Sequence, residues 1–259
     1  MAGIPFLLAG ALVGGGVVAA GLSPVPRSAT AAGTAAGDVL DGASPRVGLA
    51  GSVAIRRPVA LFVGDSYTAG SGGAGPQRSF ACLTARTMGW ICRNDGEPGT
   101  GYTNRGKVHG DANDTYAQRA LPPAPGPGAA TAPRVDVVVV TGGRNDSGSS
   151  VPVRLAAAGL TLDRLRVTYP DARLVVVGPF WVDDDVPPSL LAFNEGLRAE
   201  ARARDLTFVD PIGERWLTTA GRQRWVAADE VHPSVAGHQR LAAMLVAALE
   251  AAGFQVGTL

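Results

Sequence analysis

The feature that most constrains the fold is a run of four consecutive valines at positions 137–140, inside the segment 135–141. β-Branched side chains favour strands. A strand that is apolar at every position must be covered on both faces, which is typical of a parallel sheet between two layers of helices. The segment therefore predicts a central strand of such a sheet.

Shorter apolar segments and helical patterns alternate along the rest of the chain. Further strands are predicted over residues 59–63, 90–93, 173–178 and 206–209. One helix is predicted from the helical spacing of Phe80, Leu83, Thr84, Thr87 and Met88, and two more are predicted over 153–167 and 189–204. A last helix is predicted with Ser234 as its N-cap and Gly253 at its end. Its apolar face consists of Leu241, Met244, Leu245, Ala248 and Leu249. Strands joined by helical crossovers run parallel, so the prediction is α/β: a five-stranded, doubly wound sheet in three α/β/α layers.

Composition points to one exported domain that does not bind nucleic acid. The chain has 259 residues, 46% hydrophobic, and a net charge of +1 with no basic stripe. Residues 6–22 are apolar and uncharged, and Ala29-Thr30-Ala31 resembles a signal-peptidase site, although the first basic residue is Arg27. Residues 1–31 are therefore expected to be a signal peptide or an uncleaved anchor. Contact with a membrane is expected only through this segment, and only if it is not cleaved. The expected localisation is secreted or associated with the cell envelope.

The remaining boundaries follow from composition as well. Residues 32–57 are rich in Ala, Gly, Ser and Pro and are expected to be a linker. The catalytic domain is expected over 58–255, with an irregular insertion at 102–134. Cys82 and Cys92 are the two cysteines, and export favours a disulfide between them that ties a helix to the next strand. Two buried thiols are the alternative.

Polar turns follow three of the predicted strands. Gly64-Asp65-Ser66 follows the first strand, Gly99 to Gly101 follow the second, and Gly142-Gly143-Arg144-Asn145-Asp146 follows the third. The carboxyl ends of parallel strands meet at one edge, where sites form. Ser66 is either a nucleophile at that edge or a local turn residue. A general base close to its hydroxyl would favour the nucleophile.

His232 is the best candidate for that base. The other histidines are His109, expected to be exposed in the insertion, and His238, expected to have a structural role on the flank of the last helix. Asp229 precedes His232 by three residues and can reach its Nδ1, which would fix the tautomer as the imidazole takes a proton from Ser66.

An acyl-transfer reaction also needs donors for the oxyanion. The candidates are the N–H groups of Ser66 and Gly99 and the side-chain amide of Asn145. The alternatives are a flexible loop at Gly99 and a turn at Asn145.

Together these residues resemble the SGNH, or GDSL-type, hydrolase family of esterases and lipases. The four sequence blocks of that family are matched in order by Gly64-Asp65-Ser66, Gly99, the block 142–146 and Asp229-Glu230-Val231-His232-Pro233. The resemblance implies a flavodoxin-like sheet, a Ser-His-Asp triad, a three-donor oxyanion hole and no metal or cofactor. Tyr67 replaces the family's leucine, Arg144 enlarges the third block, and Gly101 is an alternative to Gly99.

The expected function is an exported serine esterase acting on short-chain acyl or acetyl esters. Acyl transfer or lipase activity with the same triad is an alternative, as is an inactive surface-binding module. Tyr67, Gly101, Arg144, Phe180 and Trp181 are candidates for the substrate wall, unless the aromatic residues only pack the core edge. The expected partner is a small-molecule, glycan or lipid ester, and the expected state is a monomer.

Two rival functions fit less well. Residues 70–75 satisfy G-x-G-x-x-G, but the string begins six residues after Gly64 and is followed by Pro76, so dinucleotide binding is not expected. The loop is instead expected to be a flexible rim near Ser66. A two-metal phosphoesterase would need more histidine ligands, and Asp183-Asp184-Asp185 is expected to be a solvated loop, with cation binding as the alternative.

Overall fold

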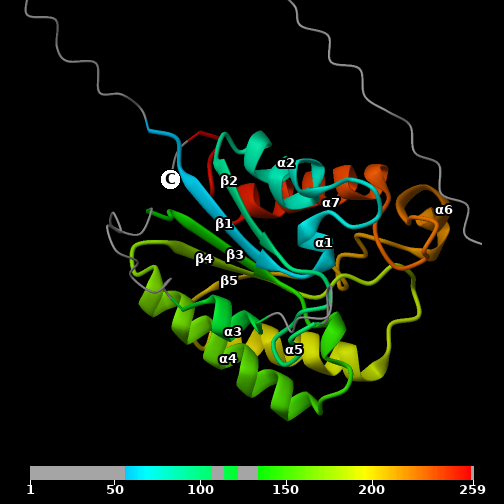
Figure 1. Ribbon diagram of the computed structural model, residues 1–259, viewed down its shortest axis with the longest axis horizontal. Coiled ribbons are helices and arrows are strands. Elements are labelled where there is room, and N and C mark those ends of the chain that lie inside the picture. The colour runs from blue at the N-terminus through cyan, green and yellow to red at the C-terminus, as the bar shows by residue number, and fades with distance from the viewer. Residues whose placement is uncertain (1–55, 107–113, 122–133, 258–259) are drawn as a thin grey trace, which may run out of the picture. The chain divides into compact units, whose positions relative to one another are not determined.

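A computed structural model describes residues 56–106, 114–121 and 134–257 (Figure 1). Most of the expected leader and linker lies outside these residues, as does His109. The strands within these described residues are β1 (Val59–Gly64), β2 (Ile91–Gly96), β3 (Val137–Thr141), β4 (Arg173–Val177) and β5 (Thr207–Val209). They form one sheet in the order β2-β1-β3-β4-β5, and every neighbouring pair is parallel. The predicted doubly wound sheet is confirmed, with its switch in strand order between β1 and β3.

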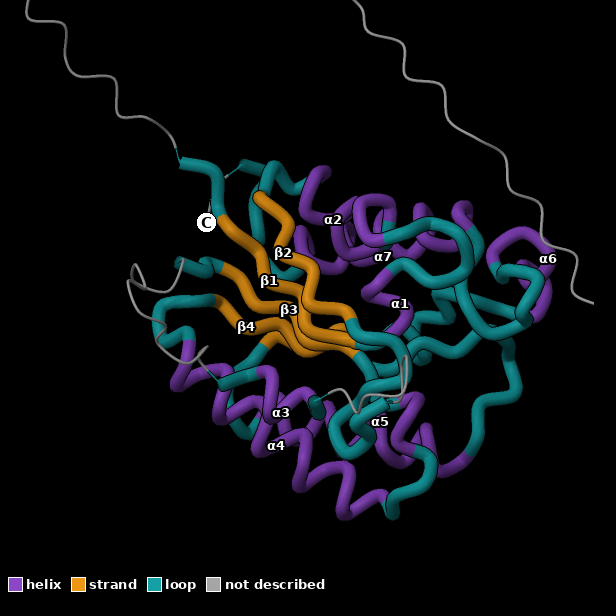
Figure 2. Tube along the Cα trace, in the orientation of Figure 1, coloured by secondary structure: helices purple, strands orange, loops and turns teal. Residues whose placement is uncertain are grey.

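Helices cover both faces of this sheet (Figures 1 and 2). One face carries α2 (Phe80–Thr87) and α7 (Val235–Ala251), and the other carries α3 (Tyr116–Arg119), α4 (Val151–Thr168) and α5 (Pro188–Arg202). Two short helices, α1 (Ser66–Ala69) and α6 (Arg222–Trp225), are the remaining α-helices of the described residues. Of the helices in the described residues, none is both long and apolar enough to span a bilayer.

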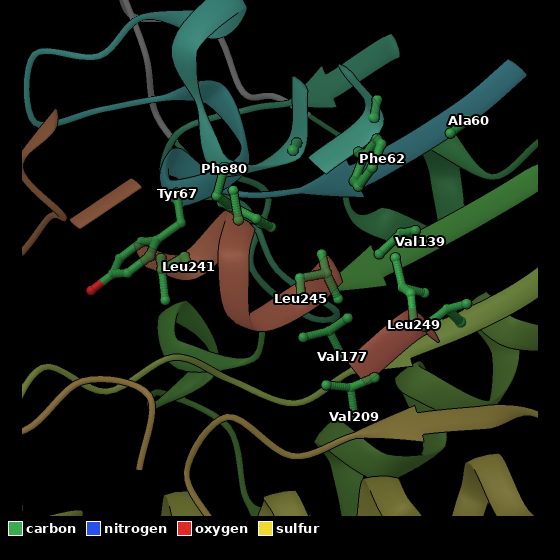
Figure 3. Close-up of a cluster of buried hydrophobic side chains, with 14 of the residues drawn as sticks. Ala60, Phe62, Tyr67, Phe80, Val139, Val177, Val209, Leu241, Leu245 and Leu249 are labelled. Carbon is green, nitrogen blue, oxygen red and sulfur yellow. The ribbon is translucent and has the colours of Figure 1, made fainter. Parts of the chain in front are cut away.

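The valine run is the centre of two hydrophobic clusters. All five residues of β3 are buried, and successive side chains alternate between the faces. Val137 and Val139 join the cluster under α2 and α7, while Val138 and Val140 join the cluster under α4 and α5. Figure 3 shows the first cluster, with Tyr67 at one end. Burial on both faces explains why no polar residue interrupts the run.

Three local predictions need correction. β2 continues to Gly96 instead of ending at Arg93, because Val63 and Gly64 of β1 pair with Asp95 and Gly96. α2 ends at Thr87, which is exposed, and Met88 lies at its C-cap, although the spacing that predicts the helix includes both residues. The insertion at 102–134 is not wholly irregular, since it contains α3.

The predicted disulfide is present between Cys82 of α2 and Cys92 of β2. The start of the last helix also follows the prediction, because the Ser234 hydroxyl accepts a hydrogen bond from the N–H of Gly237. α7 ends at Ala251, two residues before Gly253, which has a positive φ of 80°.

Candidate active site

A tight turn at the end of β1 presents Ser66. The Asp65 carboxylate caps α1 by accepting the N–H of Tyr67 at 2.9 Å, and Ser66 is the first residue of that helix. Gly64 allows the turn to close, because a Cβ there would lie 2.0 Å from Thr68 Oγ1. Ser66 is only 7% exposed, so its hydroxyl lies at a fixed position on the edge of the sheet.

His232 and Asp229 complete a continuous hydrogen-bonded chain with Ser66. His232 Nε2 lies 2.9 Å from Ser66 Oγ, and Nδ1 lies 2.7 Å from Asp229 Oδ2. The other carboxylate oxygen of Asp229 accepts the N–H groups of Val231 and His232, each at 2.9 Å. The loop before α7 is therefore folded around Asp229, which sets the position of the imidazole.

Two of the acidic residues at the site, Asp229 and Asp65, lie in opposite electrostatic environments. Hydrogen bonds from the backbone N–H and imidazole of His232, and from the N–H of Val231, lower the pKa of Asp229 to about 2. Burial raises the pKa of Asp65 to about 6, against the lowering effects of the Tyr67 N–H and the Arg144 charge. At neutral pH Asp229 is thus a stable carboxylate facing His232.

The predicted oxyanion donors lie on the neighbouring loops. The Asn145 amide donates one hydrogen to the Thr100 carbonyl at 2.9 Å, and an amide has a second hydrogen available. The N–H of Gly101 donates to the Asn104 carbonyl at 2.8 Å. The N–H groups of Ser66 and Gly99 donate to no protein acceptor within the described residues. Of the two glycines, Gly99 is therefore the one with a free donor.

Asp146 fixes the loop that carries these donors, a role that the sequence did not reveal. Its buried carboxylate accepts the N–H groups of Tyr102, Thr103 and Asn104 at 2.8–3.0 Å. Together with the bond between Asn145 and Thr100, this joins the turn after β3 to the loop after β2. The two loops are held as one unit.

Arg119 is a second residue that sequence reasoning missed. Its side chain is 6% exposed and forms an ion pair with Asp95 at 3.0 Å. Nη2 donates to the Gly64 carbonyl at 2.9 Å and to Thr100 Oγ1 at 3.1 Å. Arg119 thereby links the end of β1, the end of β2 and the Gly99 loop, and the insertion that contains it gave no pattern from which to infer this.

The five candidates for the substrate wall lie in different environments. Tyr67 and Phe180 are buried and stacked, with ring centroids 5.5 Å apart. Both belong to the core cluster on the α2 and α7 face. Arg144 and Trp181 are half-buried at the rim, where the guanidinium carbon lies 4.5 Å from the indole centroid. Gly101 is buried beside Asp146.

The glycine-rich loop at 70–75 packs against the histidine loop. A Cβ on Gly72 would lie 2.1 Å from the Pro233 carbonyl oxygen. His238 is fully buried instead of lying on a flank of α7, and its ring nitrogens bond the Phe80 N–H at 3.2 Å and the Ser71 carbonyl at 2.9 Å. Burial lowers the pKa of His238, so the neutral ring joins α2, α7 and the 70–75 loop. This is the structural role that was expected for it.

The acidic run at 183–185 contacts cations from neighbouring segments. Asp183 pairs with Arg222 at 3.1 Å, and Asp184 pairs with Arg215 at 2.8 Å. Asp183 also accepts the indole N–H of Trp181 at 2.8 Å. Across the described residues, no group of three or more His, Cys, Asp or Glu side chains is arranged to hold a metal ion.

Known proteins share both the sequence pattern and the fold. The model of the GDSL-like lipase/acylhydrolase family matches residues 62–240. The GDSL lipase Rv0518 of Mycobacterium tuberculosis is 36% identical over 194 residues, which cover 71% of this chain and 78% of the relative.

Solved structures give the same result for the fold. A family two carbohydrate esterase from Clostridium thermocellum in complex with cellohexaose aligns with a TM-score of 0.55 and 21% identity, over 77% of this chain and 66% of the esterase. The M. smegmatis aryl esterase aligns with a TM-score of 0.53 and 17% identity, over 76% of this chain and 99% of the esterase. The range matched by the family model contains Ser66, Asn145 and His232. The chain therefore belongs to the GDSL-like lipase/acylhydrolase family of carboxylic ester hydrolases.

Proposed function

We propose that this chain is an exported serine esterase that hydrolyses carboxylic esters, with a preference for acetyl and other short acyl groups. The observation that carries the proposal is the continuous chain of hydrogen bonds from Ser66 Oγ through His232 to Asp229, with separations of 2.9 and 2.7 Å. This is the arrangement that a hydroxyl nucleophile needs, with an orienting carboxylate behind its base.

In the proposed reaction, Nδ1 of His232 carries the hydrogen that it donates to Asp229, which leaves Nε2 free to accept. Nε2 takes the hydroxyl proton as Ser66 Oγ attacks the ester carbonyl carbon. The carbonyl π electrons move to oxygen, and the resulting oxyanion is held by the N–H groups of Ser66 and Gly99 and by the amide of Asn145.

Collapse of this intermediate breaks the bond between the acyl carbon and the alcohol oxygen. His232 Nε2 returns its proton to the departing alcohol, and the acyl group remains on Ser66 Oγ. A water molecule then takes the place of the alcohol: His232 removes its proton, the acyl carbon is attacked, and the carboxylic acid leaves as Ser66 regains its hydrogen.

The preference for short acyl groups is supported by how the aromatic residues next to Ser66 are packed. Tyr67 stacks on Phe180, and Phe180 packs edge-on against Phe80 with ring centroids 5.1 Å apart. All three rings are buried, so they fill the space beneath the serine turn instead of lining an open channel. A long acyl chain would have to lie along the surface of the protein.

A chain-length series tests both parts of the proposal. The substrates are p-nitrophenyl esters from acetate to laurate, and the variants are Ser66→Ala and, as a matched control, Ser147→Ala on an exposed turn. We expect kcat/KM to be highest for acetate to butyrate, to vanish in Ser66→Ala and to be unchanged in Ser147→Ala. Turnover that survives in Ser66→Ala would overturn the mechanism, and a maximum at laurate would indicate a lipase.

Export is supported by the apolar segment at 6–22 and by the disulfide between Cys82 and Cys92, since such bonds persist mainly outside the reducing cytosol. The proposed mature chain begins after Ala31. Mass spectrometry of the protein recovered from the culture medium and the cell envelope tests this. A full-length chain found only in the cytosol, with both thiols reduced, would contradict it.

A further inference from the structure

Arg144 lies beside the proposed oxyanion donors and is held there by aromatic side chains. It directly precedes Asn145 in a short 3-10 helix, Arg144–Asp146. Its guanidinium carbon lies 4.5 Å from the Trp181 ring centroid, and Nη1 donates to the Tyr67 hydroxyl at 3.2 Å. The Tyr67 ring in turn lies 5.8 Å from the His232 ring, so only one aromatic ring separates the cation from the imidazole.

The guanidinium retains most of its hydrogen-bonding capacity. Arginine has five N–H donors, and Arg144 makes one side-chain hydrogen bond within the described residues. No described carboxylate lies within 4.0 Å of it. The neighbouring rim arginines differ, because Arg215 pairs with Asp184 and Arg222 pairs with Asp183.

The carboxylates nearest to the site have partners other than Arg144. Asp65 accepts the Tyr67 N–H, and Asp146 accepts three backbone N–H groups of the loop after β2. Asp229 accepts two backbone N–H groups and the His232 imidazole. A half-buried cation with free donors, fixed by stacking on Trp181, is therefore available to a ligand at this rim.

We propose that Arg144 binds an anionic group of the ester substrate, so that the site selects esters with a carboxylate or similar oxyanion on the acyl or the alcohol portion. A planar guanidinium recognises such groups through paired N–H donors. The inference rests on the proposed esterase function and specifies its substrate class. Trp181 acts as the platform that sets the plane of the guanidinium.

Two matched substrate pairs test the inference and identify the portion that carries the charge. For the acyl side, mono-p-nitrophenyl succinate is compared with p-nitrophenyl butyrate. For the alcohol side, 4-acetoxybenzoate is compared with phenyl acetate. The proteins are the wild type, Arg144→Gln, Arg144→Lys and the control Arg215→Gln, whose arginine is exposed and already paired.

We expect Arg144→Gln to lower the ratio of kcat/KM for the anionic ester to that for the neutral ester by about 10- to 100-fold in one pair. Arg144→Lys should recover part of the ratio, and Arg215→Gln should leave it unchanged. Added salt should reduce the wild-type ratio, because it screens a charged contact. Ratios in both pairs that stay within about threefold of wild type in Arg144→Gln would overturn the inference.

A binding measurement separates this inference from the proposed mechanism. Saturation-transfer NMR with monoethyl succinate and ethyl butyrate on Ser66→Ala and Ser66→Ala/Arg144→Gln needs no turnover. For an acyl-side charge, only the succinate should bind more weakly to the double variant. 4-Acetoxybenzoate serves as the ligand for an alcohol-side charge. Equal binding of each anionic ester to both proteins would overturn the role of Arg144, whatever nucleophile the enzyme uses.

Discussion

Replacing Asp229 with Asn changes the tautomer of His232 while preserving most of the local structure. The carboxylate accepts two backbone N–H groups on one oxygen and His232 Nδ1 on the other. The Asn oxygen can retain the two backbone bonds, but its NH₂ group then faces Nδ1. Because NH₂ cannot accept a hydrogen bond, the imidazole must carry its hydrogen on Nε2, the nitrogen that faces Ser66 Oγ at 2.9 Å.

The expected loss in kcat is about 10⁴-fold, because Nε2 with a hydrogen cannot take the serine proton. This corresponds to about 5.4 kcal/mol of transition-state stabilisation. The loss in folding stability is much smaller. The lowering of the Asp229 pKa from 3.8 to about 2 corresponds to at most about 2.5 kcal/mol, and solvent screening of this half-exposed carboxylate reduces it to about 1 kcal/mol.

The assay is kcat on p-nitrophenyl acetate from about pH 5 to 10, together with urea unfolding of the same preparation. Glu230→Gln is the matched control, since it removes a charge from the same loop at a side chain that pairs with Arg222 at 3.6 Å. A kcat for Asp229→Asn within about tenfold of wild type would refute the assigned role of Asp229.

Three further predictions concern the oxyanion site and the stability of the fold. Asn145→Ala should lower kcat on p-nitrophenyl acetate about 10²–10³-fold, and an unchanged kcat would remove Asn145 from the site. Tyr67→Phe should lower the free energy of unfolding, measured in urea, by about 1–2 kcal/mol, because the Tyr67 hydroxyl donates to the Val231 carbonyl at 2.6 Å. Tyr116→Phe should leave that free energy unchanged or raise it, because the buried Tyr116 hydroxyl has no hydrogen-bond partner within the described residues. Equal losses in the two variants would contradict both assignments. Asp136 has a pKa lowered to about 2, chiefly by the side chain of Arg56, so its stabilising effect is present above about pH 4 and disappears as the pH falls towards 2. In thermal unfolding, Asp136→Asn should therefore lower the free energy of unfolding by about 1–2 kcal/mol at pH 7 and by little at pH 2. An equal loss at both pH values would contradict the ion-pair explanation.

The parts of the fold that the sequence predicts well are those decided by local pattern. Residues 137–140 are buried on both faces of the sheet, so the short apolar run is enough to identify them as a central strand. Asp229 and His232 are three residues apart, and their contact is equally local. The alternation of predicted strands and helices leads to the correct parallel sheet, in which the carboxyl end of β1, followed by Ser66, lies between the carboxyl ends of β2 and β3.

The parts that were missed depend on contacts between distant segments. The hydroxyl of Tyr67 bonds the carbonyl of Val231, 164 residues away, and Arg119 reaches back 55 residues to Gly64. Neither pairing leaves a periodic signal. The hydrogen bond from the Gly101 N–H to the Asn104 carbonyl is a local exception: it spans three residues, but it lies in an irregular loop that has no periodic pattern.

Covalent trapping with a fluorophosphonate tests whether Ser66 is a nucleophile that His232 activates. The phosphorus accepts the attacking oxygen and loses fluoride, so a single adduct remains on the nucleophile and can be located by peptide mass spectrometry. We expect one adduct per chain, on Ser66, that forms far more slowly in His232→Ala and is absent in Ser66→Ala. An adduct on another residue, or a labelling rate that is the same in His232→Ala, would contradict it.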